Sequence, residues 1–196
     1  MRFARDRGGG LPLLTMVALA LASTSTQAQE PSSASPSPLA QQLIAQLDSQ
    51  DAYERQKAFV QLEALREPAT APMVRSYLKS REPQTRAFSV RALAAIEGLQ
   101  SVPTVLDILQ RDRNPQVRVA AVLALEPLRD PASTPVVIKA LRDRKAEVRM
   151  AAVDVLSRLE DPHARAAILL RWKRERHRDV RRVLEDALKR MGITPP

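Results

Sequence analysis

The sequence predicts an all-α solenoid of about five copies of one helical-hairpin unit, because three sets of residues repeat in the same phase. Arginines recur every 31 or 32 residues, at Arg55, Arg86, Arg118, Arg149 and Arg181, which we call the register arginines. Leucines recur with them at Leu47, Leu78, Leu109 and Leu141, with Trp172 next, and prolines at Pro72, Pro103 and Pro135. Self-similarity at this period is typical of stacked units that bury their apolar faces against one another.

Each unit divides into two helical segments. The first surrounds the register arginine, and the second ends at the leucine. Positions three and seven after the arginine define one face of a helix. The position three residues after the arginine is mostly small: Ala58, Ser89, Ala121, Ala152 and Leu184. The position seven residues after it is always leucine: Leu62, Leu93, Leu125, Leu156 and Leu188. A further helix with Leu39, Leu43 and Leu47 on one stripe is expected to cap the amino end of the stack.

Helix starts are expected where a capping side chain precedes a proline, at Asn114-Pro115, Asp130-Pro131 and Asp161-Pro162. The composition agrees with helices. Of 196 residues, 44% are hydrophobic but only 3% aromatic, so the core is aliphatic, and five glycines leave few hairpin turns for an all-β fold. The absence of cysteine excludes disulfides and thiolate metal sites.

The amino terminus predicts export to the periplasm or the medium. Residues 1–28 have the pattern of a signal peptide: three early arginines, an apolar run over 11–22, and small residues up to Ala28, after which cleavage is expected. The apolar run is shorter than the roughly 18 residues that span a bilayer, and no later segment is apolar enough, so no stable membrane span is expected after cleavage. Residues 29–38 form a predicted disordered linker and 39–192 the repeat domain.

The chain is basic, with a formal charge of +9. Removing residues 1–28 removes three arginines and one aspartate, which leaves +7. Residues 171–190 hold nine Lys or Arg against four Asp or Glu, so much of the excess lies at the carboxyl end. A basic end favours an acidic partner, whether protein, anionic lipid, polyanionic polymer or nucleic acid.

The segment from Asp112 to Arg118, followed by Ala120-Ala121-Val122 and Leu125, resembles HEAT repeats of the short phycobilin-lyase type. A similar pattern runs from Asp143 through Arg149 to Leu156, and the resemblance covers about residues 38–191. It implies that Asp and Arg form a ladder between neighbouring repeats, and that the second helices line a concave binding surface.

The register arginines are therefore interpreted as structural rather than as an anion-binding row. The ladder is expected to contain all five of them, with Asp112 and Asp143, each arginine meeting the acid of the preceding unit. The position six residues before the arginine holds Asp112, Asp143 and Glu175, but Ser49 and Ser80 in the first two units. Asp48 or Asp51 is expected to substitute in part at the amino end.

The second helices carry the predicted partner-binding residues. One face of each is apolar throughout, so the opposite, mixed face should meet solvent. That face grows more basic and more apolar toward the carboxyl end, as an interface core with a cationic rim does. The alternative is that this is an ordinary solvated helix face. The residues of the mixed face are Met73, Ser76, Lys79, Thr104, Asp107, Gln110, Val136, Lys139, Arg142, Ala167, Leu170 and Lys173.

No catalytic motif, phosphate loop, cofactor site or metal site is indicated by the sequence. His163 and His177 are interpreted as surface residues, and Trp172 as a packing residue rather than a platform for stacking bases or sugars. The sequence thus favours an exported, non-enzymatic scaffold that binds a protein with an acidic surface. The alternatives are binding of nucleic acid or another polyanion through the basic carboxyl-terminal repeats and, more remotely, an enzyme like the phycobilin lyases.

Overall fold

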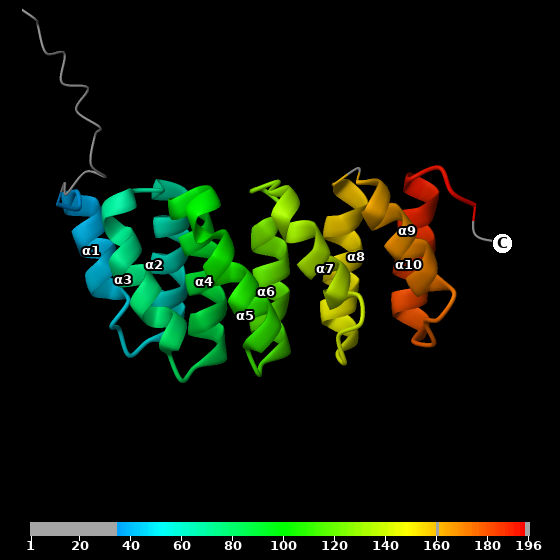
Figure 1. Cartoon of the computed structure of the whole chain (residues 1–196). Coiled ribbons are helices and arrows are strands. Elements are labelled where there is room, and N and C mark those ends of the chain that lie inside the picture. The colour runs from blue at the N-terminus through cyan, green and yellow to red at the C-terminus, as the bar shows by residue number, and fades with distance from the viewer. Residues whose placement is uncertain (1–34, 160, 195–196) are drawn as a thin grey trace, which may run out of the picture. The chain divides into compact units, whose positions relative to one another are not determined.

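The computed structural model describes residues 35–159 and 161–194, and across them every regular element is helical. Figure 1 shows the helices following one another in chain order as a stack of hairpins, which confirms the predicted all-α solenoid. The predicted signal peptide, its cleavage point and most of the predicted linker lie outside the described residues. Within that predicted linker, Pro38 already begins the first helix, α1 (Pro38–Gln46), whose amino end the Ser37 hydroxyl caps.

The first helices of the five units form one layer. They are α2 (Ala52–Leu65), α4 (Pro83–Glu97), α6 (Pro115–Leu125), α8 (Ala146–Arg158) and α10 (Arg178–Arg190). Each packs closely against the next along the stack, and α1 packs on α2. The leucines seven residues after the register arginines are at most 1% exposed: Leu62, Leu93, Leu125, Leu156 and Leu188. Burial of this kind stabilises a side chain by about 1.5 to 3 kcal/mol, so this layer forms the core.

The second helices contact one another much more sparsely than the first helices do. They are α3 (Ala71–Ser76), α5 (Val102–Arg111), α7 (Thr134–Ala140) and α9 (Pro162–Trp172). Short 3₁₀ turns flank three of them: η1 (Pro68–Thr70), η2 (Tyr77–Lys79), η3 (Gly98–Ser101) and η4 (Pro131–Ser133). The repeated prolines Pro72, Pro103 and Pro135 lie in the first turns of α3, α5 and α7, where a missing N–H leaves no helical bond unmade.

Capping side chains fix where the helices begin. Asn114, Asp130 and Asp161 each accept a hydrogen bond from the backbone N–H two residues later, at 2.7 to 3.1 Å. Asp130 caps the turn η4 rather than a helix directly. Gly98 ends α4 at φ +56° and ψ −132°. Arg66 ends α2 in the left-handed helical conformation, at φ 52° and ψ 35°, and Arg129 also has a positive φ, of 47°, although both carry side chains.

The stretch Pro83–Arg111 is long and apolar enough to span a membrane by length and composition alone, contrary to the expectation from the sequence. It comprises α4, η3 and α5, and 44% of its most apolar window is buried inside the fold. Its apolar residues include Val90, Leu93 and Val105, each fully buried against neighbouring helices. Packing of the second unit within the stack therefore accounts for this apolar stretch.

Candidate interaction face and arginine ladder

Charged pairs join successive units at one edge of the stack. We call this edge the loop edge. It consists of the turns that lead from α1 or from a second helix into the next first helix, and it lies along the lower side of Figure 1; the turns are at residues 47–51, 80–82, 112–114, 141–145 and 173–177. Arg86 binds Asp112 in a bidentate pair at 2.8 and 2.9 Å. Arg118 binds Asp143 in the same way, both at 2.8 Å. Such forked pairs fix orientation as well as adding energy.

The pairs run in the opposite direction to the one expected from the sequence, since each arginine meets the acid of the following unit. Four of the five register arginines also hold their own turn. In Arg55, Arg86, Arg118 and Arg149, Nη1 donates to the backbone carbonyl six residues earlier, at 2.7 to 2.9 Å. With one nitrogen occupied in this way, the rest of the guanidinium reaches onward to the next unit. The chain connection therefore sets the direction of the ladder.

The amino-terminal pair uses a different acid. Arg55 binds Glu82 at 2.7 Å. Glu82 lies two residues after Ser80, which occupies the position that holds the acid in later units, and it also accepts a hydrogen bond from the Thr85 hydroxyl. Neither Asp48 nor Asp51 substitutes: Asp51 caps α2 and Asp48 accepts a hydrogen bond from the Tyr77 hydroxyl at 2.5 Å. Each register arginine that has a following unit pairs with the acid of that unit. An acid at position 49, in the first unit, would therefore have no register arginine of a preceding unit to bind it among the described residues.

At the other end, Arg181 has no following unit within the described residues. Its guanidinium lies over the ring of Trp172, 4.8 Å from the centroid, and bonds Glu185 at 3.3 Å. Trp172 is 7% exposed and donates its indole N–H to Glu185 at 3.2 Å. The ring therefore packs against the last helix, which makes it unsuited to stacking on a ligand.

The deepest pair joins Arg149 to Glu175 at 2.9 and 3.2 Å, and Arg171 bonds the same carboxylate at 2.9 Å. Burial by itself would raise the pKa of Glu175, but hydrogen bonds from the His177 N–H and from the two guanidinium groups lower it to about 2. The pKa values of Asp112 and Asp143 are also below the usual value, since hydrogen bonds from Arg86 and Arg118 outweigh the effect of burial. The acids stay charged at neutral pH.

The structure brings the predicted partner-binding residues to the open side of the second helices. Nine of the twelve residues on that mixed face are exposed, while Thr104, Val136 and Ala167 are half-buried. The exposed ones are Met73, Ser76, Lys79, Asp107, Gln110, Lys139, Arg142, Leu170 and Lys173. We call this set of twelve the second-helix face.

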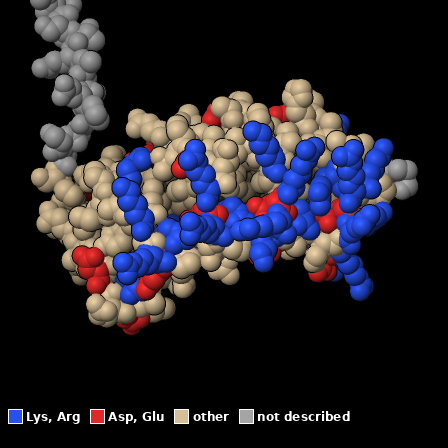
Figure 2. All heavy atoms as spheres, turned by 60° about the horizontal axis from the view of Figure 1, so that its bottom comes forward, with Lys and Arg blue, Asp and Glu red and all other residues tan. Residues whose placement is uncertain are grey.

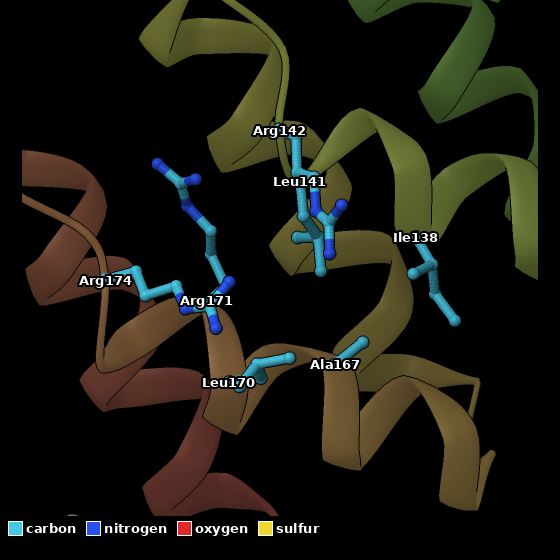
Figure 3. A pocket seen from close by; sticks show the side chains of 7 residues that line it. All are labelled: Ile138, Leu141, Arg142, Ala167, Leu170, Arg171 and Arg174. Carbon is cyan, nitrogen blue, oxygen red and sulfur yellow. The ribbon is translucent and has the colours of Figure 1, made fainter.

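A groove of about 360 Å³ separates α7 from α9 on this face. Its floor is apolar and three arginines form its rim, as Figure 3 shows; the lining residues are Ile138, Leu141, Arg142, Ala167, Leu170, Arg171 and Arg174. Arg142, Ala167 and Leu170 were predicted from the sequence as partner-binding residues, but the other four were not. Periodicity describes one helix at a time, whereas a groove is formed by the facing sides of two helices. Lys139, Arg142 and His163 line a second hollow beside it, between α7 and the start of α9.

Titratable residues do not gather into a reactive centre within residues 35–159 and 161–194. No group of three or more His, Asp or Glu side chains there is placed to hold a metal ion. His163 and His177 are both exposed, in α9 and immediately before α10. What the arrangement offers chemically is a row of paired charges and an open face with an apolar groove.

This fold and face define an α-solenoid repeat protein. A family model described as HEAT repeats matches residues 40–112 and 102–189, and the chain therefore belongs to the HEAT-repeat family. Among solved structures, it is similar to a chain of the complex of CpcE and CpcF of phycocyanin lyase from Nostoc sp. PCC7120, with a TM-score of 0.62, 24% identity, 76% of this chain covered and 96% of that one. The resemblance to repeats of the phycobilin-lyase type is thus confirmed for the fold. No curated protein matches the chain.

Proposed function

We propose that this chain is an exported, non-enzymatic scaffold that binds a protein with an acidic surface through the second-helix face. The groove between α7 and α9 carries the proposal. Leu170 is 46% exposed beside half-buried Ile138 and Ala167, so an apolar floor is open to solvent. Protein interfaces combine such an apolar centre with a polar rim.

The rim supports an acidic partner in particular. Arg171 is occupied by Glu175, but Arg142 and Arg174 form no ion pair within the described part of the chain. Both are exposed and border the apolar floor. A guanidinium group pairs well with a carboxylate, so the groove suits a segment that places one apolar side chain on Leu170 between flanking acids.

The proposal of export is supported by the sequence, and the proposal of a non-enzymatic role is supported by the kinds of groups on the surface. Residues 1–28 have the order of charge, apolar run and small residues that a signal peptide requires. The described residues offer exposed charges and an open groove, without the grouped acid, base and nucleophile that covalent catalysis needs. Scaffolding by shape and charge is the function that such a surface can perform.

Two variants test the face in pull-downs that use the full-length chain as bait. Leu170→Ser removes the apolar contact at constant charge, and we expect partner affinity to fall by at least about tenfold. Reversing Lys139, Arg142 and Lys173 to Glu should abolish partner binding, because attraction becomes like-charge repulsion. Exposed charges typically contribute less than about 1 kcal/mol to stability, so helicity and melting temperature should change little.

The matched control reverses Arg66, Arg129 and Arg165 to Glu. All three are exposed, lie at the opposite edge of the stack, and form no ion pair among the described residues. The control should keep the partner. If Leu170→Ser binds the partner as well as the unchanged chain does, the groove is not the contact and the proposal is wrong.

A further inference from the structure

Arginine occupies the same exposed position in four successive units, five residues before the register arginine. We call Arg81, Arg113, Arg144 and Arg176 the arginine column. All four lie in the loop edge and are exposed, and their side chains make no hydrogen bond or ion pair within residues 35–159 and 161–194. The first unit has Gln50 at this position.

The fold does not require arginine there. The ladder uses the register arginines and the acids, and the column contributes only backbone groups, such as the carbonyls of Arg81 and Arg113, which any residue supplies. Copying of the unit alone does not account for the column either. The exposed position two residues before the register arginine holds four different residue types in the five units: Tyr53, Gln84, Gln116, Glu147 and Asp179.

A second set of cations reinforces the column. Two residues before each column arginine stands another exposed cation, Lys79, Arg111, Arg142 or Arg174. Between the two cations in the last three units lies the ladder acid, but the arginine of the preceding unit already neutralises it. Of these four, only Arg111 forms an ion pair within the described residues, with Asp107. Figure 2 shows the result as a nearly continuous row of Lys and Arg side chains along the stack.

Apolar side chains are missing from this row. The large exposed ones in the described part of the chain are Leu39, Tyr53, Val60, Met73, Leu99, Leu123 and Leu170, and none lies in the last four turns of the loop edge. A protein interface needs an apolar centre, a membrane-inserting surface needs apolar side chains, and base recognition needs stacking platforms. A ligand on this row is therefore held by charge alone.

We propose that the arginine column and the cations beside it bind a linear phosphate polymer that runs along the loop edge. Arginine favours phosphate because its fork donates two parallel hydrogen bonds to one group. Helices of neighbouring units pack about 8 to 10 Å apart, so the three spacings between four column arginines span about 24 to 30 Å. A chain of many phosphates can reach all of them, whereas a single anion reaches one. None of the four column arginines lines the groove, although Arg142 and Arg174 border both surfaces. The proposal goes beyond the scaffold function.

The test measures binding of labelled probes to the full-length chain by fluorescence anisotropy at several salt concentrations. The probes are long-chain inorganic polyphosphate and a single-stranded oligonucleotide, with pyrophosphate as competitor. Changing Arg81, Arg113, Arg144 and Arg176 to Gln should weaken binding by about tenfold or more. It should also reduce the slope of log K against log salt by about 3, since each phosphate contact on a single strand contributes about 0.7.

The control changes Arg66, Arg129, Arg165 and Lys189 to Gln, which removes the same charge from exposed side chains at the opposite edge. It should leave affinity within about twofold, and circular dichroism should show both variants folded. Binding of polyphosphate, of the oligonucleotide, or of both supports the proposal and identifies the source of the phosphate. Pyrophosphate should compete poorly, because it reaches only one unit.

Three outcomes would overturn the proposal. One is binding of neither polymer. Another is equal loss in the column variant and the control, which would mean that only net charge matters. The third is binding of polyglutamate of matched length as tightly as polyphosphate, which would make the ligand an acidic polypeptide. The Leu170→Ser variant should bind the phosphate polymer normally, so failure of this proposal and failure of the scaffold proposal are distinguishable.

Discussion

The two ends of the stack use the same repeat but hold their neighbours together differently. Near the amino end, the ladder pair is Arg55 with Glu82, whose side chain is 58% exposed. Near the carboxyl end, it is Arg149 with Glu175, whose side chain is 3% exposed. The same kind of ion pair is thus exposed to water near the amino end and buried near the carboxyl end. The free energy lost when the pair is broken should therefore be larger near the carboxyl end.

Aromatic packing takes the place of buried charge at the amino end. Phe59 makes an edge contact with Tyr77, their ring centroids 5.6 Å apart, and stacks on Phe88 at 6.4 Å. Aromatic pairs of this kind add about 0.5 to 1.5 kcal/mol beyond the area they bury. A repeat can therefore exchange one type of junction for another while its register and helix positions stay fixed.

The first prediction breaks the ladder at both ends. Arg149→Ala should cost about 3 to 5 kcal/mol, because it leaves the charge of Glu175 buried with less compensation. Arg55→Ala should cost much less, since water solvates Glu82. Urea denaturation followed by circular dichroism measures both. Equal losses would show that burial does not distinguish the two junctions.

The fold could be predicted from the sequence because helix periodicity is local. The positions seven residues after each register arginine are all buried, and the mixed face of the second helices is mostly exposed. Both follow from a period of 3.6 residues within one helix. Capping by Asn114 and Asp161 follows from neighbouring residues in the same way.

Contacts between units could not be predicted, since spacing within a unit does not fix how far one unit is offset from the next. Because of that offset, Arg55 contacts Glu82 and not the residue at position 80. The offset also places each register arginine next to the acid of the following unit. It also creates the groove between α7 and α9, with Arg171 and Arg174 on its rim. The left-handed residues Arg66 and Arg129 were missed because turn chemistry normally marks such positions with glycine.

The second prediction compares core leucines in the middle and at the carboxyl end. Leu125→Ala should cost about 2 to 4 kcal/mol, because Leu125 is 1% exposed in α6, which packs between α4 and α8. Leu188→Ala should cost less although Leu188 is also fully buried. Within the described residues α10 packs against a first helix on one side only, so it can move to fill the cavity. Chemical denaturation of both variants measures the difference. Identical losses would contradict a stack stabilised by nearest neighbours.

The third prediction uses pH to separate the two junctions. The pKa of Glu175 is lowered from 4.5 to about 2 in the folded chain, so its stabilisation is present above about pH 4.5 and is lost as pH falls toward 2. A shift of this size corresponds to roughly 3 kcal/mol. Glu175→Gln should therefore be less stable than the unchanged chain at pH 7 and should lose less stability on acidification.

Glu82→Gln provides the comparison at the amino end. Its carboxylate also has a lowered pKa, through hydrogen bonds from Thr85 and Arg55, but it lies in water. Solvent screening should leave the acid profile of this variant close to that of the unchanged chain. Melting temperatures recorded at intervals from pH 7 to pH 2.5 give all three profiles. If Glu82→Gln flattens the profile as much as Glu175→Gln does, acid sensitivity belongs to the ladder as a whole. If only Glu175→Gln flattens it, low pH should loosen the carboxyl-terminal repeats first, because their junction depends most on a buried carboxylate.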